Sequence, residues 1–566
     1  MPVQVAFARH GKNEITFRTG QYDRSEPLFI DPTLTWNTFL GSSGYDVGYA
    51  LAVDGGGNVY VAGISDGTWG TPVRAFSGSY DAFAAKLDSS GNLTWNTFLG
   101  GSDYDVGQAL AVDGSGNIYV SGSSYTTWGS PVRAYSGNVD AFAAKLDSSG
   151  NLTWNTFLGG SDRDDSGEAL AVDASGNVYI AGFSGGTWGS PVRPFSGGVS
   201  DAYAAKLDSS GNLTWNTFLG GSDYDGGQAL ALDGSGNVYM AGSSHATWGS
   251  PVRAFNGPYN AFAAKLDFGG NLIWNTFLGG SDGDNSGQAL PVDGSGNVYV
   301  AGFCGGTWGS PVRAFSSGNE DAYTAKLDSS GNLIWNTFLG GSDGDYGYAV
   351  AVDGSGNVYV AGQSDGTWGS PDSAFSGTSD AYAAKLDSSG NLTWNTFLGG
   401  GDYDVGFALR TDGSGNVYVA GASGGTWGSP VRAYSGSLDA FVAKLSASTP
   451  TPTYSAQIQP PIDADGTSVF SVRRGVVPVK FTLTQGGVAT CALPPATIAV
   501  TRTAGGTTGE VNESVYAMSA DTGSNFRISG CQYVYNLSSS ALGVGTYRVD
   551  IKINGQVVGS AIFQLK

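Results

Sequence analysis

Short apolar runs separated by glycine-rich turns recur along most of this 566-residue chain. One unit, read from Gly107, gives GQALAVD, GSGNIYVSG, AFAAKLD and NLTWNTFLGG, with a long polar loop between the second and third runs. Short runs rich in Val, Ile, Tyr, Phe and Trp predict strands, and the intervening Gly, Asn and Asp predict tight turns. Each unit is therefore expected to hold four strands, called a, b, c and d in chain order. Strand a is rich in Ala and Gly, which suits a crowded position near a central axis.

Two tryptophan motifs count the units, because WNTFLG and TWG each occur seven times and together account for all 14 tryptophans. The WNTFLG tryptophans are Trp36, Trp95, Trp154, Trp215, Trp274, Trp335 and Trp394. The TWG tryptophans are Trp69, Trp128, Trp188, Trp248, Trp308, Trp368 and Trp427. A four-stranded unit repeated in this way is typical of the blades of a propeller.

The two ends of the repeat array predict a closed ring. A WNTFLG strand d at residues 34–41 precedes any strand a, whereas the last unit stops after strand c, where SASTPTPT replaces the expected strand d. Joining the leading strand to the trailing three completes a blade and removes the exposed edges of an open array. The expected fold is therefore all-β, a seven-bladed β-propeller of four-stranded blades over residues 31–446, closed by an N-terminal outer strand.

A second domain is expected after a Pro/Thr/Ser-rich linker at residues 447–456. Residues 457–566 show strand patterns separated by Gly and Asn turns, which predict a small β-sandwich. Cys491 and Cys531 both lie there and form a candidate disulfide, although two cysteines in one small β-domain can also be unpaired core residues. Cys304 stands alone in the repeats.

Several motifs resemble known bacterial families. AVDGSGNVYVAG, DAFAAKLDSSGNL and WNTFLGGSDYDVG resemble the bacterial SBBP repeat, the repeat of seven-bladed β-propellers, although TWGSPVRAF stands where related repeats often have a DFP-containing loop. EPLFIDPTLTWNTFLG resembles the exit from a β-rich domain that often precedes such propellers, so residues 1–30 are expected to be a remnant of that region. VVPVKFTL and GTYRVDIKINGQ resemble bacterial immunoglobulin-like modules with a PxKF motif. This last resemblance implies an Ig-like domain and a secreted or cell-surface protein.

Charge narrows the range of partners. A net charge of -21 and a pI near 4.3, without a Lys/Arg cluster, would repel phosphate backbones and anionic lipid, so neither nucleic acid nor a membrane surface is expected. No apolar run is long enough for a membrane-spanning helix, and the opening MPVQVAFARHGKNEITF lacks the apolar core of a signal peptide. We therefore expect a soluble chain of an extracellular or cell-surface protein.

The d–a and b–c loops of a propeller emerge at one end of the ring, which we call the loop face. Its d–a loops carry an aspartate in every unit, namely Asp46, Asp105, Asp164, Asp225, Asp284, Asp345 and Asp404. A ring of carboxylates could bind cations or polyhydroxyl ligands. The favoured interpretation is that these aspartates cap N–H groups in the turns.

The TWG tryptophans are the second set of candidate ligand contacts. They could stack on glycans, but filling the gap between blades is the favoured interpretation. Nearby arginines could stack on these rings or pair with loop carboxylates, and Ser373 interrupts their series. Calcium at the DGSGN and DSSGN turns is disfavoured because the turns lack DxDxDG ligand density, so no cofactor or metal is expected.

An enzyme is not the favoured interpretation. The chain has only His10 and His245 as histidines, and the repeats hold only Glu168 and Glu320 as glutamates, so acid/base groups would have to be almost wholly aspartates. The leading hypothesis is a non-catalytic binding or adhesion scaffold for a glycan or protein partner. The alternatives are a polysaccharide hydrolase or lyase on a propeller fold, and a passive surface-layer or spacer component.

Overall fold

The computed structural model describes residues 5–10, 14–19, 33–161, 163–316, 319–446, 454–463, 465–473, 475–485, 488–490, 496–505, 521–522, 525–553 and 556–566. The chain divides into two compact units. One is Asp31–Ala447, and the other combines Met1–Ile30 with Ser448–Lys566. The fold is all-β, and the one helix in the described ranges, α1, spans only Ser539–Leu542.

The described residues of the first unit form seven four-stranded antiparallel sheets, the blades, each with strands a, b, c and d in spatial order. Blade 1 is β4 (Asp46–Val53), β5 (Val59–Ser65), β6 (Asp81–Leu87) and β7 (Leu93–Leu99). Blade 2 is β8 (Asp105–Val112), β9 (Ile118–Ser124), β10 (Asp140–Leu146) and β11 (Leu152–Leu158). Blade 3 is β12 (Asp165–Val172), β13 (Val178–Ser184), β14 (Asp201–Leu207) and β15 (Leu213–Leu219). Blade 4 is β16 (Asp225–Leu232), β17 (Val238–Ser244), β18 (Asn260–Leu266) and β19 (Leu272–Leu278).

The remaining blades follow the same order. Blade 5 is β20 (Asn285–Ala289), β21 (Val298–Cys304), β22 (Asp321–Leu327) and β23 (Leu333–Leu339). Blade 6 is β24 (Asp345–Val352), β25 (Val358–Ser364), β26 (Asp380–Leu386) and β27 (Leu392–Leu398). Blade 7 is β28 (Asp404–Thr411), β29 (Val417–Ser423), β30 (Asp439–Ser446) and β3 (Thr33–Leu40).

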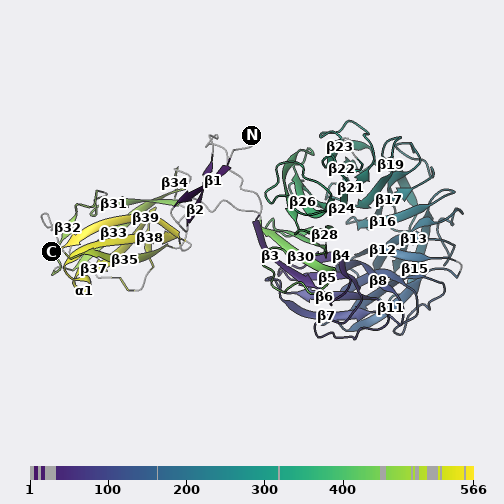
Figure 1. Cartoon of the computed structure of the whole chain (residues 1–566), viewed down its shortest axis with the longest axis horizontal. Helices are drawn as coiled ribbons and strands as arrows, with labels where there is room; N and C mark the ends of the chain where they lie inside the picture. The colour runs from purple at the N-terminus through teal and green to yellow at the C-terminus, as the bar shows by residue number, and fades with distance from the viewer. Residues whose placement is uncertain are drawn as a thin grey trace. The chain divides into compact units, whose positions relative to one another are not determined.

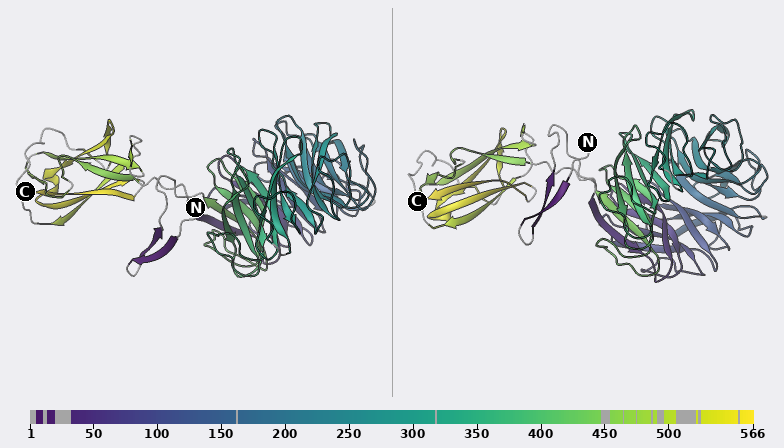
Figure 2. Two further views of the ribbon diagram at one scale, coloured as in Figure 1. Left: turned by 90° about the horizontal axis from the view of Figure 1, so that it is seen from above. Right: turned by 45° about the horizontal axis from the view of Figure 1, so that its top comes forward.

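Blade 7 closes the ring with the two ends of the array. Strand β3 pairs antiparallel with β30, so that Trp36 lies opposite Lys444 and Leu40 lies opposite Ala440. Figures 1 and 2 show β3 as a purple strand beside the green strands of blade 7. Strands a contact one another from blade to blade around the ring, including β28 with β4. The predicted propeller of four-stranded blades and its closure by the N-terminal strand are confirmed.

Every a–b ladder contains a β-bulge at the same place. In blade 2 the pairing shifts between Gly107 and Ala109, which leaves Gln108 without a partner in the ladder. The equivalent bulge residues, called the axial residues below, are Tyr49, Gln108, Glu168, Gln228, Gln288, Tyr348 and Phe407. Strand a is the inner edge of each sheet, because strands a contact one another around the ring, so each axial residue lies towards the centre of the ring.

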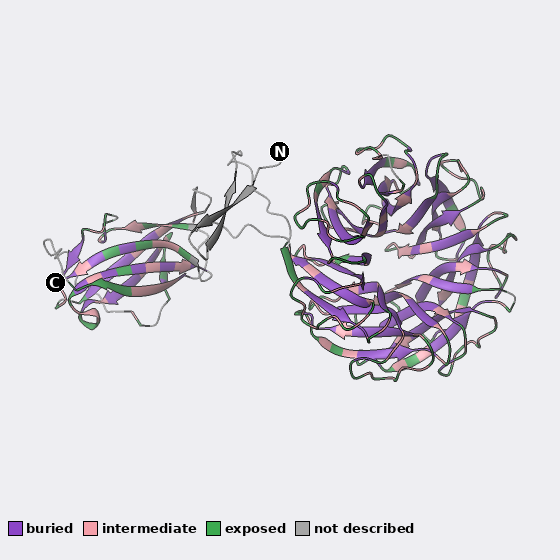
Figure 3. Ribbon diagram, viewed as in Figure 1, coloured by how far each residue is buried: buried purple, intermediate pink, exposed green. Residues whose placement is uncertain are grey.

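Neighbouring blades pack a large face against a small one. The Ala82 and Ala84 side chains of β6 contact the next blade, where they meet Val120 and Phe142. The alternate residues of β6 pack on the opposite side, where Phe83 meets the small residues of blade 7. Because successive side chains of a strand point to opposite faces, alternation of alanine with larger residues in strand c builds both surfaces. Figure 3 shows the result as mostly buried strands with exposed loops.

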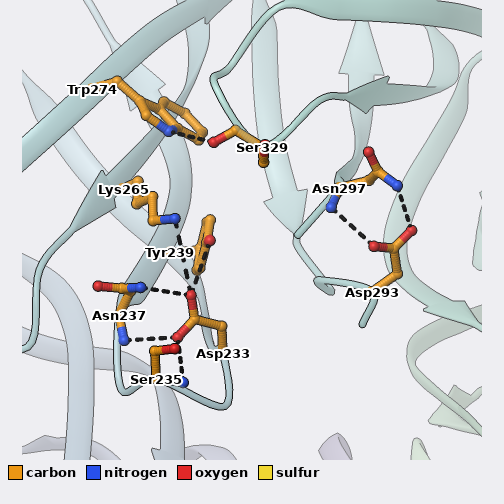
Figure 4. Close-up of polar contacts among 9 residues, drawn as sticks. All are labelled: Asp233, Ser235, Asn237, Tyr239, Lys265, Trp274, Asp293, Asn297 and Ser329. Atoms are coloured by element: carbon orange, nitrogen blue, oxygen red, sulfur yellow. Dashed lines mark hydrogen bonds and ion pairs between the residues drawn. The ribbon is translucent and has the colours of Figure 1, made fainter. Parts of the chain in front are cut away.

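The hairpins at the end opposite the loop face are held by aspartates. In blade 4 the Asp233 carboxylate accepts hydrogen bonds from the backbone N–H groups of Ser235 and Asn237, both at 2.9 Å, and from the Asn237 amide at 2.7 Å (Figure 4). Asp293 accepts the same bonds from Asn297 in blade 5. These carboxylates fix turn geometry, which is the structural interpretation of the DGSGN motif.

The C-terminal unit is a two-sheet β-sandwich. One sheet holds β31 (Tyr454–Gln459), β33 (Val476–Gln485), β34 (Val488–Thr490), β36 (Arg527–Ser529) and β37 (Gln532–Ser538). The other holds β32 (Val469–Phe470), β35 (Ala496–Ala504), β38 (Gly545–Ile553) and β39 (Gln556–Leu565). Separately, β1 (Val5–His10) pairs with β2 (Glu14–Thr19).

The core of the sandwich contains a stacked pair of rings, Phe481 and Tyr533, with centroids 4.4 Å apart. The predicted linker at 447–456 is too long, because β31 already begins at Tyr454 and pairs with β33. Its YSAQIQ sequence alternates as a strand does, but it follows the Pro/Thr run directly. The proposed pairing of Cys491 with Cys531 stays a prediction because Cys491 lies outside the described residues.

Ring closure can be tested by truncating Phe39, which is fully buried and packs edge-on against Trp427 and Tyr434 at 6.1 and 5.6 Å. We expect Phe39→Ala to lower the free energy of unfolding by about 3–5 kcal/mol, the usual cost of emptying a core phenylalanine site. Phe98→Ala in blade 1 is the matched control, since Phe98 occupies the same position within a continuous blade. Urea unfolding followed by tryptophan fluorescence compares them. A loss for Phe39→Ala far below that for Phe98→Ala would contradict closure by β3.

Candidate functional site

The loop-face aspartates that open strands a are buried. Asp46, Asp105, Asp225, Asp345 and Asp404 are at most 1% exposed. Asp46 accepts a hydrogen bond from the backbone N–H of Ser42 at 2.8 Å, and Asp105 accepts one from Gly101 at 2.8 Å. These carboxyls therefore cap the d–a loops, as the favoured interpretation expected, and do not form an open ring of ligands.

Two of the seven predicted positions are wrong by one residue. In blade 3 the buried first residue of strand a is Asp165, and Asp164 is exposed in the loop. In blade 5 the buried residue is Asn285, and Asp284 is exposed. Both d–a loops are one residue longer, so counting forward from the tryptophan selects the wrong aspartate. Counting back from the G-x-A-L pattern of strand a would have found the buried residues.

A second buried carboxyl series, which the sequence interpretation missed, opens strands c. Its members are Asp81, Asp140, Asp201, Asn260, Asp321, Asp380 and Asp439. Each lies across the boundary between two blades, called a seam, from the strand a residue of the next blade. At the first seam Gly100 separates Asp81 from Asp105, and any side chain at Gly100 would collide with both carboxyls. In the sequence each of these residues opens a D-A-[FY] motif that lies shortly before the repeated KL, with Asn260 in place of the aspartate in blade 4.

At two seams the carboxyl of strand a shares a serine hydroxyl with a backbone carbonyl. The Ser65 hydroxyl contacts both Asp46 Oδ1 and the Gly67 carbonyl, the latter at 2.8 Å. A hydroxyl has one proton to donate, so if Ser65 donates to the carbonyl, Asp46 must donate to Ser65. Ser124 repeats this arrangement with Asp105. On the other side of the seam, Oδ1 of Asp81 is buried without a partner among the described residues.

Burial sets the pKa values of the pair. Desolvation, with a smaller contribution from the charge of the facing strand c aspartate, raises the pKa of Asp105 to about 7 and that of Asp46 to about 6. The pKa rises to about 7 for Asp165, Asp225 and Asp345 and to about 6 for Asp404 by the same causes. Burial likewise raises the pKa of Asp81 to about 6.

The seam between blades 4 and 5 replaces both carboxyls with amides. There Asn260 faces Asn285, and the Asn260 amide donates to the Gly280 carbonyl at 3.4 Å. An amide matches a protonated carboxyl in shape and can donate one hydrogen bond in the same direction. The substitution is consistent with neutral pairs at the other seams.

The side chains of the TWG tryptophans are buried, with 4–8% of their surface exposed, which agrees with the favoured interpretation of packing and leaves little ring surface for a ligand. Trp69 packs edge-on against Phe83 and Phe98 of its own blade at 5.3 and 6.1 Å. Across the seam, the Arg432 guanidinium lies 5.7 Å from its ring centroid. The burial of a large aromatic ring between strands and a seam explains why the residue recurs in every blade.

The arginines of the TWGSPVR loops cross the seams. Arg74 donates to the carbonyls of Phe98 and Gly100 at 2.9 and 2.7 Å and lies 5.6 Å from the Trp128 centroid in blade 2. The same stacking holds for Arg133, Arg193, Arg253, Arg313 and Arg432 on the tryptophan of the following blade. Ser373 leaves Trp427 without such an arginine. The arginines thus stack on the rings rather than pairing with loop carboxylates.

Exposed tyrosines replace the tryptophans as the aromatic surface of the loop face. Tyr45 and Tyr125 are 41% and 45% exposed, and half-buried Tyr80 and Tyr104 lie between them. Successive ring centroids along the row are 6.2, 5.1 and 5.5 Å apart. The four residues, called the tyrosine row, precede β4, β6 and β8 and follow β9, so the row crosses the seam between blades 1 and 2. Sequence reasoning missed it because these positions are not repeated in all units.

Within the part of the chain that the structure describes, no group of three or more His, Cys, Asp or Glu side chains is placed to hold a metal ion. The described residues also include no helix long and apolar enough to cross a membrane. Cys304 is a free, buried thiol at the end of β21, where other blades have serine.

The fold and the repeated seams define a β-propeller repeat protein. The SBBP β-propeller repeat model matches residues 94–127 and 334–367, which lie in blades 1 and 2 and in blades 5 and 6. The chain therefore carries SBBP β-propeller repeats.

Curated relatives are distant. The chain is 24% identical over 400 residues to the regulatory protein FlaEY of Caulobacter vibrioides, covering 63% of this chain and 40% of that protein. It is 20% identical to an uncharacterized WD repeat-containing protein of Acanthamoeba polyphaga mimivirus, covering 65% of this chain and 34% of that one. The chain thus spans well under half the length of these relatives.

Solved structures to which the chain is similar include hydrazine synthase of Kuenenia stuttgartiensis, at 11% identity and a TM-score of 0.41, covering 66% of this chain and 92% of that one. An ulvan lyase, a polysaccharide lyase bound to its saccharide, gives 10% identity and a TM-score of 0.34, covering 69% and 92%.

The raised carboxyl pKa values predict that stability falls as pH rises. A carboxyl with a pKa near 3.9 unfolded and about 6–7 folded binds more protons in the native state between these values, so its contribution is fully present below about pH 4 and lost through about pH 7. The hydrogen bonds from Asn92 lower the pKa of Asp88 in its hairpin, so aspartates of this kind make stability depend on pH only in more acidic solution. We expect the urea midpoint to fall steadily from pH 5 to pH 8.

Seam variants provide the controls for this measurement. The double variant Asp81→Asn with Asp105→Asn copies the natural amide seam and should reduce the fall of the urea midpoint from pH 5 to pH 8. The double variant Asn260→Asp with Asn285→Asp adds a carboxyl pair and should increase that fall. A midpoint that is constant or rises from pH 5 to pH 8 would contradict protonated pairs. Stabilisation by calcium at pH 8 that the amide pair abolishes would instead indicate that the carboxyls hold a cation.

The interrupted arginine series predicts a stabilising substitution. Ser373→Arg should place a guanidinium over Trp427 and raise the free energy of unfolding by about 0.5–1 kcal/mol, the usual worth of such stacking. Ser373→Lys is the control, since lysine adds the charge without the planar fork. Chemical denaturation of both variants is the measurement, and equal effects would show that charge alone acts at this seam.

Proposed function

We propose that this chain is a non-catalytic binding scaffold of a bacterial cell surface or extracellular space, which presents the loop face of its propeller to a glycan or protein partner. The tyrosine row is the observation that carries the proposal. Four adjacent rings, two of them well exposed, offer an aromatic surface at the loop face. Tyrosine combines an apolar ring with a polar hydroxyl, and it is enriched in binding surfaces of proteins.

The symmetry of the blades supports a scaffold. The repeated carboxyls, tryptophans and arginines are all engaged in seams and turns, so their repetition follows from packing. We further infer that the C-terminal sandwich is an immunoglobulin-like module that acts as a spacer, on the strength of its two-sheet architecture and the resemblance of its VVPVKFTL segment. A polysaccharide hydrolase or lyase is the alternative, and turnover of a glycan panel by the full chain would establish it.

The tyrosine row is tested by binding of the full chain to a glycan array and to candidate surface proteins. Combined Tyr45→Ala and Tyr125→Ala substitutions should weaken the detected binding at least fivefold, since truncating a contacting aromatic usually costs more than about 1 kcal/mol. Phe268→Ala is the control, because Phe268 is 69% exposed in a hairpin at the opposite end of the strands. Equal loss with Phe268→Ala, or no loss with the tyrosine variant, would contradict a binding surface at the row.

A further inference from the structure

The seven axial residues break the symmetry of the propeller. They are equivalent by position, since each is the bulge residue of an innermost strand, and each is half-exposed. Seams and turns repeat one residue type almost without exception, whereas the axial position holds tyrosine, phenylalanine, glutamine or glutamate. A unique site is therefore best sought at the centre of the ring.

The axial residues separate into two arcs. Tyr348, Phe407 and Tyr49 come from consecutive blades 6, 7 and 1, and their successive ring centroids are 5.3 and 5.2 Å apart. Gln108, Glu168, Gln228 and Gln288 come from blades 2 to 5. The neighbouring layer of strand a follows the same division in part, with Val47 and Val405 on the aromatic side and Ser166 and Ser286 on the polar side. The centre of the ring thus has an aromatic wall and a polar wall.

Glu168 is the one carboxylate among the axial residues. Ser166 donates a hydrogen bond to its Oε1 at 2.5 Å, and among the described residues no lysine or arginine pairs with it. Burial raises the pKa of Glu168, so that a cation beside it would favour the ionised form. In the same polar arc, Gln228 Oε1 is buried without a hydrogen-bond partner in the described structure. Gln228 Oε1 is therefore an acceptor that lacks a donor, and Glu168 is a carboxyl that lacks a cationic partner among the described residues.

The loop face adds a negative rim above this centre. Its exposed d–a loop aspartates are Asp103, Asp164, Asp223, Asp282, Asp284, Asp343 and Asp402. The arginines of the TWGSPVR loops do not neutralise this rim, because they bind carbonyls and stack in the seams. Arg163, in the d–a loop of blade 3, donates to the carbonyls of Gly198 and Val199 and leaves the rim with a net negative charge. A rim on which one sign of charge predominates attracts ligands of the opposite sign.

We propose that the centre of the ring binds an organic ammonium group, with Glu168 as its counter-ion and the rings of Tyr49, Tyr348 and Phe407 as its aromatic wall. A cation gains from the carboxylate, from the negative faces of aromatic rings and from amide oxygens, all of which are present. A cation would stabilise the ionised form of Glu168, whereas a neutral polyol offers the buried carboxylate no compensating charge. This proposal goes beyond the scaffold role and does not depend on the tyrosine row.

The first test is titration of choline into the full chain by calorimetry. We expect saturable binding that the Glu168→Gln variant weakens about tenfold or more, and no binding of the neutral isostere in which tert-butyl replaces trimethylammonium. Glu320→Gln is the matched control, since Glu320 lies in the loop before β22, where it accepts a bond from Tyr346 at 2.9 Å. The proposal would be overturned if the neutral isostere bound as tightly as choline, or if Glu320→Gln weakened binding as much as Glu168→Gln. It would also be overturned if neither choline nor the lysine model Nα-acetyllysinamide bound.

A second series of titrations tests the aromatic wall and distinguishes the possible sources of the ammonium group. Phe407→Leu keeps apolar volume but removes the ring, and it should weaken choline binding at least threefold while leaving thermal unfolding close to that of the parent. Nα-acetyllysinamide, a model of a lysine side chain, replaces choline in a parallel titration. Tighter binding of choline points to a free quaternary amine, and tighter binding of the lysine model points to a basic protein partner. Unchanged choline affinity in Phe407→Leu would contradict the aromatic wall, whatever the tyrosine row binds.

Discussion

The packing of a large blade face against a small one is the constraint on which this propeller depends. Ala82 and Ala84 make one side of strand c small, and Phe83 makes the other side large, so that each blade fits its two neighbours differently. An isolated blade would expose both faces, so stability comes from the closed ring. This is why β3 and blade 7 matter, since without β3 one blade would lack its outer strand and a free edge would remain.

Close approach at the seams determines their chemistry. Only glycine fits between Asp81 and Asp105, and the two carboxyls meet in a place that excludes water. Two adjacent carboxylates there would repel each other and lose solvation, so protonation is the lower-energy state. The amide pair of Asn260 and Asn285 reaches the same neutral state without a titrating group. The raised pKa values of these carboxyls therefore make the stability of the seams depend on pH.

Much of this arrangement could be predicted from the sequence, because repetition reports packing directly. Two tryptophan series and the offset ends gave the blades and their closure. The burial of the strand c carboxyls could not be predicted from the sequence. Nothing in the local sequence distinguishes Asp81 from an aspartate at a solvent-exposed strand end, because it becomes buried only when two blades pack together. Asp164 and Asp284 were misassigned because a one-residue longer loop shifts a motif counted from one side. The buried tryptophans could not be told from exposed ones, because burial depends on the Arg and Phe partners that the fold brings to them.

Repetition also explains where function should be sought. A residue in a seam meets the same partners in every blade, so substitution there costs stability and the residue type persists. An axial residue has no partner in the a–b ladder and takes no part in the carboxyl pairs or Trp–Arg stacks of the seams, so it is free to differ between blades. Differences at such positions would be scattered if they were neutral drift alone, yet aromatic residues occupy consecutive blades and polar residues occupy the others. That segregation places aromatic and polar side chains on different sides of one axis, which is the pattern that a ligand with an apolar and a polar side would select.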